Sequence, residues 1–225
     1  MENSDITVLI SAYNEEKTIQ DLIKKIRKNY PNILVVVAKK STDNTYNLAK
    51  EVGAKVIYDN GKGNGAAKRI GIKEVKTNII VLMDADGSHH PSDIHKLVEP
   101  IKENKADLVI GSRILGGSDE LNEPGHFLRY VATAFVVFTI NKRFNAELTD
   151  VEDWFRAIKK DVALSLNLNA DDFDIEQEII MKCLKKKYRV LEVPVHEYRR
   201  KHGGSNIHLL KIGHKFIWRL FKELF

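Results

Sequence analysis

The chain of 225 residues has few of the residues that mark several protein classes. Its single cysteine, Cys183, excludes an internal disulfide, and no Cys/His cluster has the spacing of a zinc site. The longest uncharged apolar stretch, residues 130–141, is much shorter than the ~20 residues that a spanning helix needs. The first residues lack the basic segment of a signal peptide. These absences favour a reducing, cytoplasmic location, and we expect no segment to cross a membrane.

Positive charge is concentrated at the C-terminal end of the sequence. Residues 196–225 contain seven Lys or Arg and two acidic residues, an excess equal to the net charge of +5 of the whole chain. Such a segment favours contact with phosphate groups, an anionic membrane surface or nucleic acid. Because no nucleic-acid-binding motif accompanies it, we expect no nucleic-acid partner.

Short apolar runs alternate with helical segments in the first half of the chain. The expected strands are 6–10, 33–37, 55–58, 79–84 and 107–110, and the expected helices are 15–29, 42–52, 63–75 and 91–103. This rhythm is typical of a parallel sheet with helices on both faces. After an irregular stretch at 116–125, the later part predicts helices at 127–144, 174–186 and 207–225, a strand-to-helix passage at 149–160 and a strand at 189–198.

Two carboxylates, Asp84 and Asp86, follow the apolar run of residues 79–83. Ligands of open α/β sheets bind beyond the carboxyl ends of such strands. Two oxygen ligands at this spacing suit one Mg²⁺ or Mn²⁺ that also contacts substrate phosphates. A solvent-exposed turn is the alternative, since Asp and Gly are common in turns.

An ordered set of motifs resembles the family 2 glycosyltransferases of the GT-A fold. The matching segments are 11–15 (SAYNE), 41–45 (STDNT), 61–65 (GKGNG), 84–86 (DAD) and 111–113 (GSR). Three later segments, at 150–156, 192–195 and 200–205, resemble the dolichyl-phosphate mannose synthase branch. The resemblance implies an α/β, Rossmann-like, mainly parallel sheet in a domain at 1–206, followed by a basic amphipathic helix at 207–225. Within the domain, 1–115 would bind the nucleotide-sugar and 116–206 the acceptor.

The activity implied by this resemblance is metal-dependent, inverting transfer of a hexose from a nucleotide-sugar to a polyprenyl phosphate such as dolichyl phosphate. GDP-mannose is the expected donor and UDP-glucose the alternative. The enzyme would act as a peripheral protein at the cytoplasmic face of the membrane. Two other hypotheses stay open: a soluble glycosyltransferase with a small-molecule or glycan acceptor, and a nucleotide-sugar-binding protein without catalysis.

The resemblance also assigns roles to individual residues. Asp84, Asp86 and Ser88 would hold Mg²⁺ or Mn²⁺, with Ser88 at a position where the family often has Gln. His89 and His90 lie close by, but His suits softer metals better than Mg²⁺.

Catalysis would use Asp86, Asp150, Arg113 and Arg200. A lipid phosphate is already an anionic nucleophile, so positioning by cations replaces a strong base. The acceptor phosphate would contact Arg113, Arg129, Thr133, Arg200 and Ser205; with a hydroxyl acceptor, Asp150 becomes the candidate base.

Nucleotide-sugar contacts are expected from one further set of residues: Ala12, Tyr13, Glu15, Lys39, Asp59, Lys62, Asp84 and Ala85. One departure from the family affects this set. Residues 38–40 are Ala-Lys-Lys, where family members usually have two Asp and a Gly. Because Lys can only donate, Lys39 and Lys40 could meet a base carbonyl or a phosphate, or could point into solvent. The identity of the base therefore stays open.

The C-terminal segment places Lys211, Lys215, Arg219 and Lys222 on one helical face, and Leu210, Ile217, Phe221 and Leu224 on another. We expect this helix to lie in a membrane interface, with its Lys among the headgroups and Trp218 at the boundary. The alternative is that its apolar face packs on the sheet. The apolar helix at 127–144 could form a groove for a polyprenyl chain or a dimer interface.

Overall fold

The computed structural model of the chain describes residues 3–120, 127–200, 202 and 209–224. The side chains of 127–130 and 209–212 are not among those described. Ser205 and the side chain of Arg129, both expected at the acceptor phosphate, therefore lie outside the described residues, as does most of the 200–205 motif.

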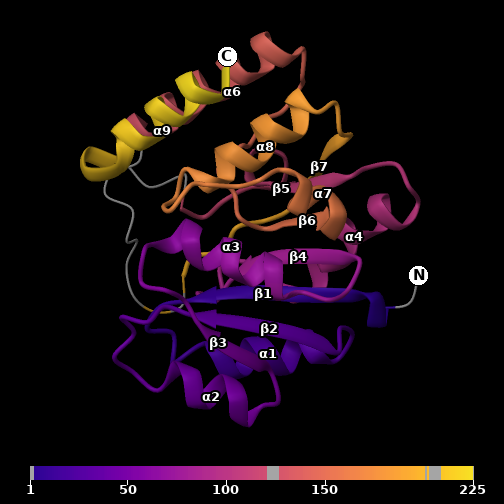
Figure 1. The fold of residues 1–225 in the computed structure, drawn as a ribbon, viewed down its shortest axis with the longest axis vertical. Helices are drawn as coiled ribbons and strands as arrows, with labels where there is room; N and C mark the ends of the chain where they lie inside the picture. The colour runs from indigo at the N-terminus through magenta and orange to yellow at the C-terminus, as the bar shows by residue number, and fades with distance from the viewer. Residues whose placement is uncertain (1–2, 121–126, 201, 203–208, 225) are drawn as a thin grey trace.

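A seven-stranded sheet in the order β3-β2-β1-β4-β6-β5-β7 organises the described residues (Figure 1). The strands are β1 (Ile6–Ala12), β2 (Asn32–Val37), β3 (Lys55–Tyr58), β4 (Ile79–Asp84), β5 (Leu108–Ser112), β6 (Arg156–Lys159) and β7 (Val190–Pro194). Only β6 runs antiparallel to its neighbours, β4 and β5. All other pairs are parallel, which confirms the predicted α/β fold with a mainly parallel sheet.

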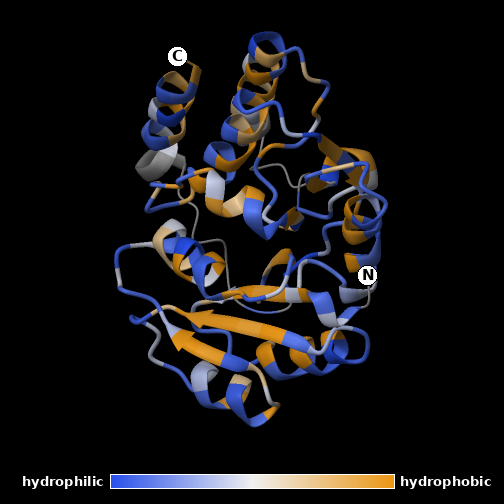
Figure 2. Cartoon of the chain, turned by 45° about the vertical axis from the view of Figure 1, so that its right-hand side comes forward, coloured by the Kyte–Doolittle hydropathy of each residue, from blue (hydrophilic) through white to orange (hydrophobic). Residues whose placement is uncertain are grey.

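The central strands are buried on both faces, which explains their continuous apolar sequences. Figure 2 shows this as almost uninterrupted hydrophobic colour along the strands at the centre of the fold. One face packs against α1 (Ile19–Arg27), α2 (Thr45–Glu51) and α4 (Ile94–Lys102). The other packs against α3 (Asn64–Glu74), α6 (Phe127–Phe144), α7 (Lys160–Ser165), α8 (Ile175–Lys185) and α9 (Leu209–Leu224). The prediction of helices on both faces is confirmed.

Several predicted boundaries differ from the structure. The helix expected at 15–29 begins at Ile19, because Asn14 has a positive φ of 54° and the Glu15 N–H donates to Thr45 Oγ1. The predicted strand 189–198 ends as β7 at Pro194, and beyond it Glu197 forms a single bridge with Ser118. The passage at 149–160 contains β6, whose antiparallel direction the βα rhythm of the first half did not indicate.

Three short helical segments complete the described structure: η1 (Asn3–Asp5), η2 (Pro91–Asp93) and α5 (Arg113–Gly116). Within the described residues, every helix is too short or too polar to span a bilayer. The division of the domain at 115/116 stays a prediction.

Candidate active site

The Asp-Ala-Asp segment lies at the carboxyl edge of the sheet, where β1 and β4 end side by side. Asp84 is the last residue of β4 and is paired in register with Ser11 of β1, whose Oγ donates to Asp84 Oδ1 at 2.9 Å. Asp86 follows in a tight loop and is almost fully buried. Its Oδ1 accepts hydrogen bonds from the Ser88 N–H at 3.0 Å and the Ser88 hydroxyl at 2.7 Å. The predicted pair therefore lies at a strand end, as a ligand site of this fold requires.

Negative charge is crowded at this edge. Burial raises the pKa of Glu15 to about 7 against a hydrogen bond from Thr18, and Asp86 and Asp84 raise it further. Burial, with the charge of Asp86, also raises the pKa of Asp84. Arg200 faces the same cluster, with its Nε 3.3 Å from Asp86 Oδ2 and 3.3 Å from Glu120 Oε1. The edge thus combines buried carboxylates with the guanidinium of Arg200, a residue that comes near the end of the domain in the sequence.

Asp86 is connected to the interior through a chain of polar contacts. The Ser88 hydroxyl lies 3.3 Å from His89 Nδ1, and His89 Nε2 lies 3.1 Å from Asp153 Oδ2. Burial opposes protonation of His89, but the charge of Asp153 outweighs it and raises the pKa of His89 to about 9. The ring also stacks on Phe155 at a centroid distance of 4.8 Å. His89 therefore joins Asp153 to Ser88 and, through Ser88, helps to hold Asp86 in place.

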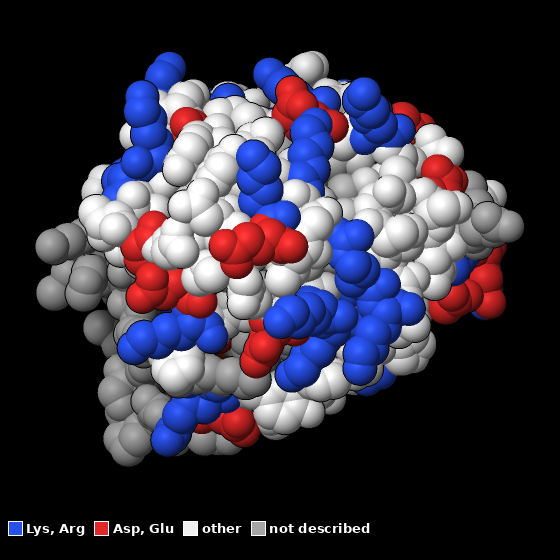
Figure 3. All heavy atoms as spheres, turned by 90° about the horizontal axis from the view of Figure 1, so that it is seen from below, with Lys and Arg blue, Asp and Glu red and all other residues white. Residues whose placement is uncertain are grey.

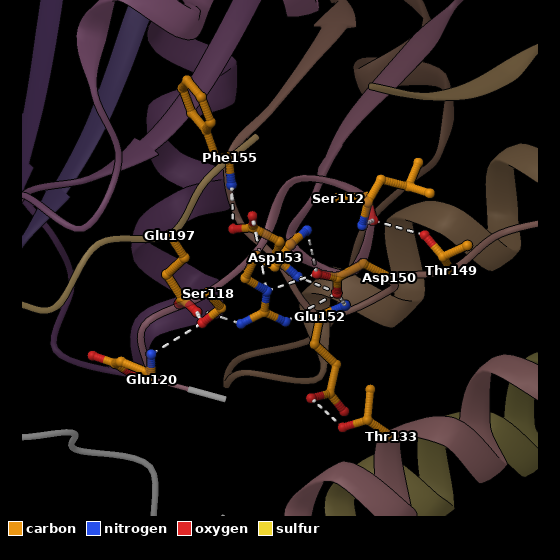
Figure 4. A network of polar contacts seen from close by, with 12 residues as sticks. Ser112, Ser118, Glu120, Thr133, Thr149, Asp150, Glu152, Asp153, Phe155 and Glu197 are labelled. Carbon is orange, nitrogen blue, oxygen red and sulfur yellow. Dashed lines mark hydrogen bonds and ion pairs between the residues drawn. The ribbon is translucent and has the colours of Figure 1, made fainter. Parts of the chain in front are cut away.

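Asp150, labelled in Figure 4, forms a buried ion pair with Arg113. Arg113 Nε and Nη2 donate to Asp150 at 2.6 and 2.9 Å, and Arg113 Nη1 lies 3.4 Å from Glu197 Oε1. Burial alone would raise the pKa of Asp150, but Arg113 lowers it to about 2. The predicted roles of both side chains in contacting substrate stay predictions. In this structure they bind each other and fix the loop that follows Thr149.

A second buried ion pair lies on the α3 side of Asp84. The Lys68 ammonium donates to Glu176 of α8 and sits 3.6 Å from the centroid of the Trp154 ring. Its charge also acts on Asp84 against the effect of burial. Gly65, one turn earlier in α3, lies so close to the Asp172 carbonyl that a Cβ would come within 2.5 Å of it. The glycine-rich segment 61–65 therefore allows α3 to approach the loop before α8 and brings Lys68 to the site.

Four of the residues that are predicted to contact the nucleotide lie just after β1, β2 and β3: Tyr13, Lys39, Asp59 and Lys62. Lys40 Nζ lies 4.7 Å from the centroid of the Tyr13 ring. Asp59 Oδ1 accepts hydrogen bonds from the N–H groups of Lys39 at 2.7 Å and Gly61 at 2.9 Å. Asp59 therefore orders the loop after β3, and Lys39 contributes to that loop through its backbone. Ala12 ends β1, Ala85 is buried between the two Asp, and Lys62 is exposed on the loop before α3.

Thr133 of α6, expected at the acceptor phosphate, donates from Oγ1 to Glu152 Oε2 at 2.9 Å (Figure 4). This contact joins α6 to the loop that carries Asp150. The sequence interpretation did not select His89 as a site residue, and it gave no role to Asp153, which lies within the 150–156 motif. It did not single out Lys68, Glu176 or Glu197 for the site. The one available signal was a charged residue within an apolar helical stretch, as at Lys68, and that signal does not identify a partner.

Oxygen ligands for a divalent cation are available from Asp84 and Asp86. In the part of the chain that the structure describes, no group of three or more His, Cys, Asp or Glu is arranged to hold a metal ion. Ser88 donates its hydroxyl to Asp86 Oδ1, and its expected role as a metal ligand stays a prediction. A cation at this pair would need its remaining ligands from water or substrate phosphates, as Mg²⁺ commonly does.

The chain is similar to enzymes that transfer sugars to dolichyl phosphate. A UDP-N-acetylglucosamine–dolichyl-phosphate N-acetylglucosaminyltransferase of Methanococcus voltae is 30% identical over 240 residues, with 96% of this chain and 94% of that protein covered. A dolichol-phosphate mannosyltransferase of Pyrococcus furiosus is 32% identical over 210 residues, with 90% and 59% covered.

A crystal structure of glucosyl-3-phosphoglycerate synthase from Mycobacterium tuberculosis, with Mn²⁺, UDP-glucose and phosphoglyceric acid, has the same fold. It matches with a TM-score of 0.75 at 19% identity, over 97% of this chain and 79% of that one. The family model described as glycosyl transferase family 2 matches residues 7–164, more than half of the chain. Together with the Methanococcus relative, this match shows that the chain is a glycosyltransferase of the GT-A fold and belongs to glycosyl transferase family 2.

Proposed function

We propose that this enzyme transfers a hexose from a nucleotide-sugar to the phosphate of a polyprenyl phosphate of the dolichyl type. One observation carries the proposal: the Arg200 guanidinium lies next to the carboxylates of Asp84 and Asp86 at the carboxyl edge of the sheet. A cation–diphosphate unit fits the carboxylates, and an anionic acceptor fits the guanidinium. The dolichyl-phosphate enzymes of Methanococcus and Pyrococcus, which are 30% and 32% identical, support the same acceptor.

Mg²⁺ or Mn²⁺ is the cofactor in this proposal, held by Asp84 and Asp86. The residues fit a hard divalent cation, because buried carboxylates with raised pKa values are stabilised by added positive charge. When bound, the ion neutralises the charge that develops on the leaving nucleoside diphosphate. The Mn²⁺ in the Mycobacterium synthase structure supports this assignment.

The state of Asp150 favours a phosphate acceptor over a hydroxyl acceptor. A hydroxyl needs a general base, whereas a phosphate is already anionic. Asp150 is the candidate base, but it is almost fully buried, bidentate to Arg113, and has its pKa lowered to about 2. A carboxylate this acidic is a poor proton acceptor at neutral pH. Arg200, with Arg129, Thr133 and Ser205, would instead hold the acceptor phosphate in line with the anomeric carbon.

The donor in this proposal is GDP-mannose, with a UDP-hexose as the second candidate. The Pyrococcus relative is a mannosyltransferase, whereas the Methanococcus relative uses UDP-N-acetylglucosamine. Lys39 and Lys40, in place of the usual carboxylates, would meet the base carbonyls or the diphosphate. The enzyme would act at the cytoplasmic face of the membrane.

The test is transfer of radiolabelled sugar into a lipid extract. Purified enzyme is incubated with dolichyl phosphate, Mn²⁺ or Mg²⁺, and in turn GDP-mannose, UDP-glucose and UDP-N-acetylglucosamine. We expect lipid-linked product with one donor, and none with EDTA. Asp86→Asn should lower the rate by about 1,000-fold, while Asp21→Asn, on the exposed face of α1, should not. Label in water-soluble acceptors only, or nucleotide-sugar binding without turnover, would refute the proposal.

A further inference from the structure

Helix α9 is docked with its charged side facing the protein. Arg219 is almost fully buried, and its guanidinium lies 2.8 Å from Asp174 Oδ2 and 3.2 Å from Glu178 Oε1. One turn earlier, Lys215 Nζ lies 2.7 Å from Asp172 Oδ2. The expected arrangement, with the basic residues of this helix directed at lipid headgroups, is therefore wrong for Lys215 and Arg219. These cations bind the acidic surface of α8 and the loop before it.

Part of the apolar surface of α9 consequently faces away from the protein, although Leu220 and Leu224 pack against the core. Ile217, Trp218 and Phe221 are between 55% and 60% exposed, whereas Leu220 is buried. A surface helix of a globular protein normally shows the opposite arrangement, with its apolar stripe on the core. The alternative, that the apolar face packs on the sheet, is therefore wrong for Ile217 and Phe221, whereas Leu224 of that face does pack against the core.

Helix α6 continues the same surface. Val131, Phe135 and Phe138 follow one another at intervals of four and three residues and are between 46% and 62% exposed. Val136 and Ile140 lie on the opposite side of the helix and are buried. The two helices run side by side, with their C-terminal ends joined by a 2.9 Å hydrogen bond from Arg143 Nε to the Leu224 carbonyl (Figure 1).

We infer that these residues form a surface that inserts into the interface of an anionic lipid bilayer. We call it the two-helix face: Val131, Phe135, Phe138, Ile217, Trp218 and Phe221. Scattered apolar residues are normal on a protein surface, but exposed aromatic side chains gathered on two adjoining helices point to an interaction site. Interfacial helices bury such a face at the boundary between headgroups and acyl chains.

Cations at the rim of the two-helix face favour a bilayer as its occupant. Lys222 Nζ lies 4.8 Å from the Trp218 ring centroid, and Lys142 Nζ lies 5.9 Å from that of Phe138. Both residues are exposed. Aromatic rings with adjoining Lys are typical of the headgroup level, where the ammonium pairs with lipid phosphate. A second copy of the chain would have to desolvate these ammonium groups, which is costly without a paired carboxylate.

The opposite end of the molecule is strongly charged, as Figure 3 shows for the face beneath α1 and α2. Lys24, Lys25 and Lys28 are exposed there. The insertion proposal rests on the proposed function in one respect: a polyprenyl acceptor is dissolved in the bilayer. Thr133 connects α6 to the site, since its contact with Glu152 leads to Asp150 through a 3.1 Å bond from the Glu152 N–H. Insertion of α6 would bring the site to the lipid surface.

The experiment is flotation of the purified chain with vesicles of phosphatidylcholine containing phosphatidylglycerol, without donor or metal. We expect binding, and a variant with Phe135, Phe138, Trp218 and Phe221 all changed to Ser should bind about 100-fold more weakly. Leu164→Ser removes an apolar side chain that is 43% exposed on α7, away from this face, and should leave binding unchanged. Because Lys215 and Arg219 are paired with carboxylates of the protein, raising NaCl from about 0.1 M to about 1 M should weaken binding less than tenfold.

Activity assays separate this inference from the proposed function. The four-site variant should keep its rate with a short-chain, water-soluble polyprenyl phosphate and lose it with dolichyl phosphate in vesicles. Circular dichroism and the melting temperature verify that the variant is folded. Wild-type protein that does not float would overturn the inference, even if it transfers sugar to the soluble acceptor. A wild-type dimer that the four substitutions convert to a monomer, with no vesicle binding by either, would assign the face to a second copy instead.

Discussion

Asp150→Asn tests the strongest electrostatic claim about the site. Asp150 accepts five hydrogen bonds, from three nitrogens of Arg113 and from the N–H groups of Glu152 and Asp153. Asn keeps the shape of the side chain but has one acceptor oxygen, so its amide nitrogen must face either the guanidinium or these backbone donors. Removing one partner of a buried ion pair costs about 3–5 kcal/mol. For a chain of this size the expected fall in melting temperature is roughly 6–20 °C.

The lowered pKa of Asp150 determines how the stability difference between wild type and variant changes with pH. Arg113 lowers the pKa of Asp150 from 3.8 to about 2 against the effect of burial. A lowered carboxyl pKa stabilises the fold above the unfolded value, and this contribution is lost as pH falls from about 4 through about 2. It amounts to about 2 kcal/mol. The difference in melting temperature between wild type and variant should therefore be largest at pH 5–7 and should narrow toward pH 2.

Differential scanning calorimetry of both proteins across this pH range measures the effect. Asp21→Asn, an exposed carboxylate on α1, is the control and should change stability by about 0.5 kcal/mol or less. A variant as stable as wild type at pH 7 would refute the claim that the Arg113–Asp150 pair stabilises this loop. A difference in melting temperature that does not narrow on acidification would refute it as well. Residual transferase activity in the folded variant with a phosphate acceptor would further support the view that Asp150 is not a base.

Three further substitutions test other parts of the site. Lys68→Met leaves Glu176 without its buried cation and should lower the free energy of unfolding by about 3–5 kcal/mol in urea titrations; Lys73→Met, at an exposed position of α3, should change it little. Glu15→Gln should raise the melting temperature of the metal-free protein. The pKa of Glu15 is raised to about 7, so its carboxyl destabilises the fold increasingly as pH rises from 4.5 to about 7. Equal melting temperatures of wild type and variant at pH 8 would contradict this. Arg200→Ala should raise KM for the polyprenyl phosphate by about 10-fold or more while leaving KM for the nucleotide-sugar within a few-fold; the reverse pattern would place Arg200 at the donor.

The first half of the fold was predictable because its signals are local. Continuous apolar runs such as 79–83 specify buried parallel strands, and each helix between them closes a βα unit. The position of Asp84 follows directly, since a residue after a buried strand must lie at the carboxyl edge. The direction of β6 was not predictable in this way. It inserts between β4 and β5 after a long excursion through α6, and that pairing depends on tertiary packing.

The buried ion pairs were not predictable from sequence, because each joins residues far apart in the chain. Lys68 and Glu176 are 108 residues apart, and Arg113 and Glu197 are 84 apart. A charged residue in a helix is usually solvated, so the sequence around Lys68 does not identify the partner on α8 that allows its burial. The motifs predict which residues would contact the substrate. The contacts that fix those residues came only from the structure.

The orientation of α9 shows the physical limit of pattern analysis most clearly. The sequence of α9 predicts a hydrophobic face and a basic face, and the burial of apolar area favours packing the hydrophobic face against the protein. The choice between faces depends on the surface that receives the helix. Here that surface presents Asp172 and Asp174, whose ion pairs with Lys215 and Arg219 would be lost beneath an apolar stripe. Glu178 also contacts Arg219 but has a second ion pair with Lys182. Unpaired buried carboxylates cost more than partial exposure of Trp218 and Phe221, particularly where a bilayer can cover the aromatic side chains. The acidic residues around the start of α8 therefore decide which side of α9 faces outward.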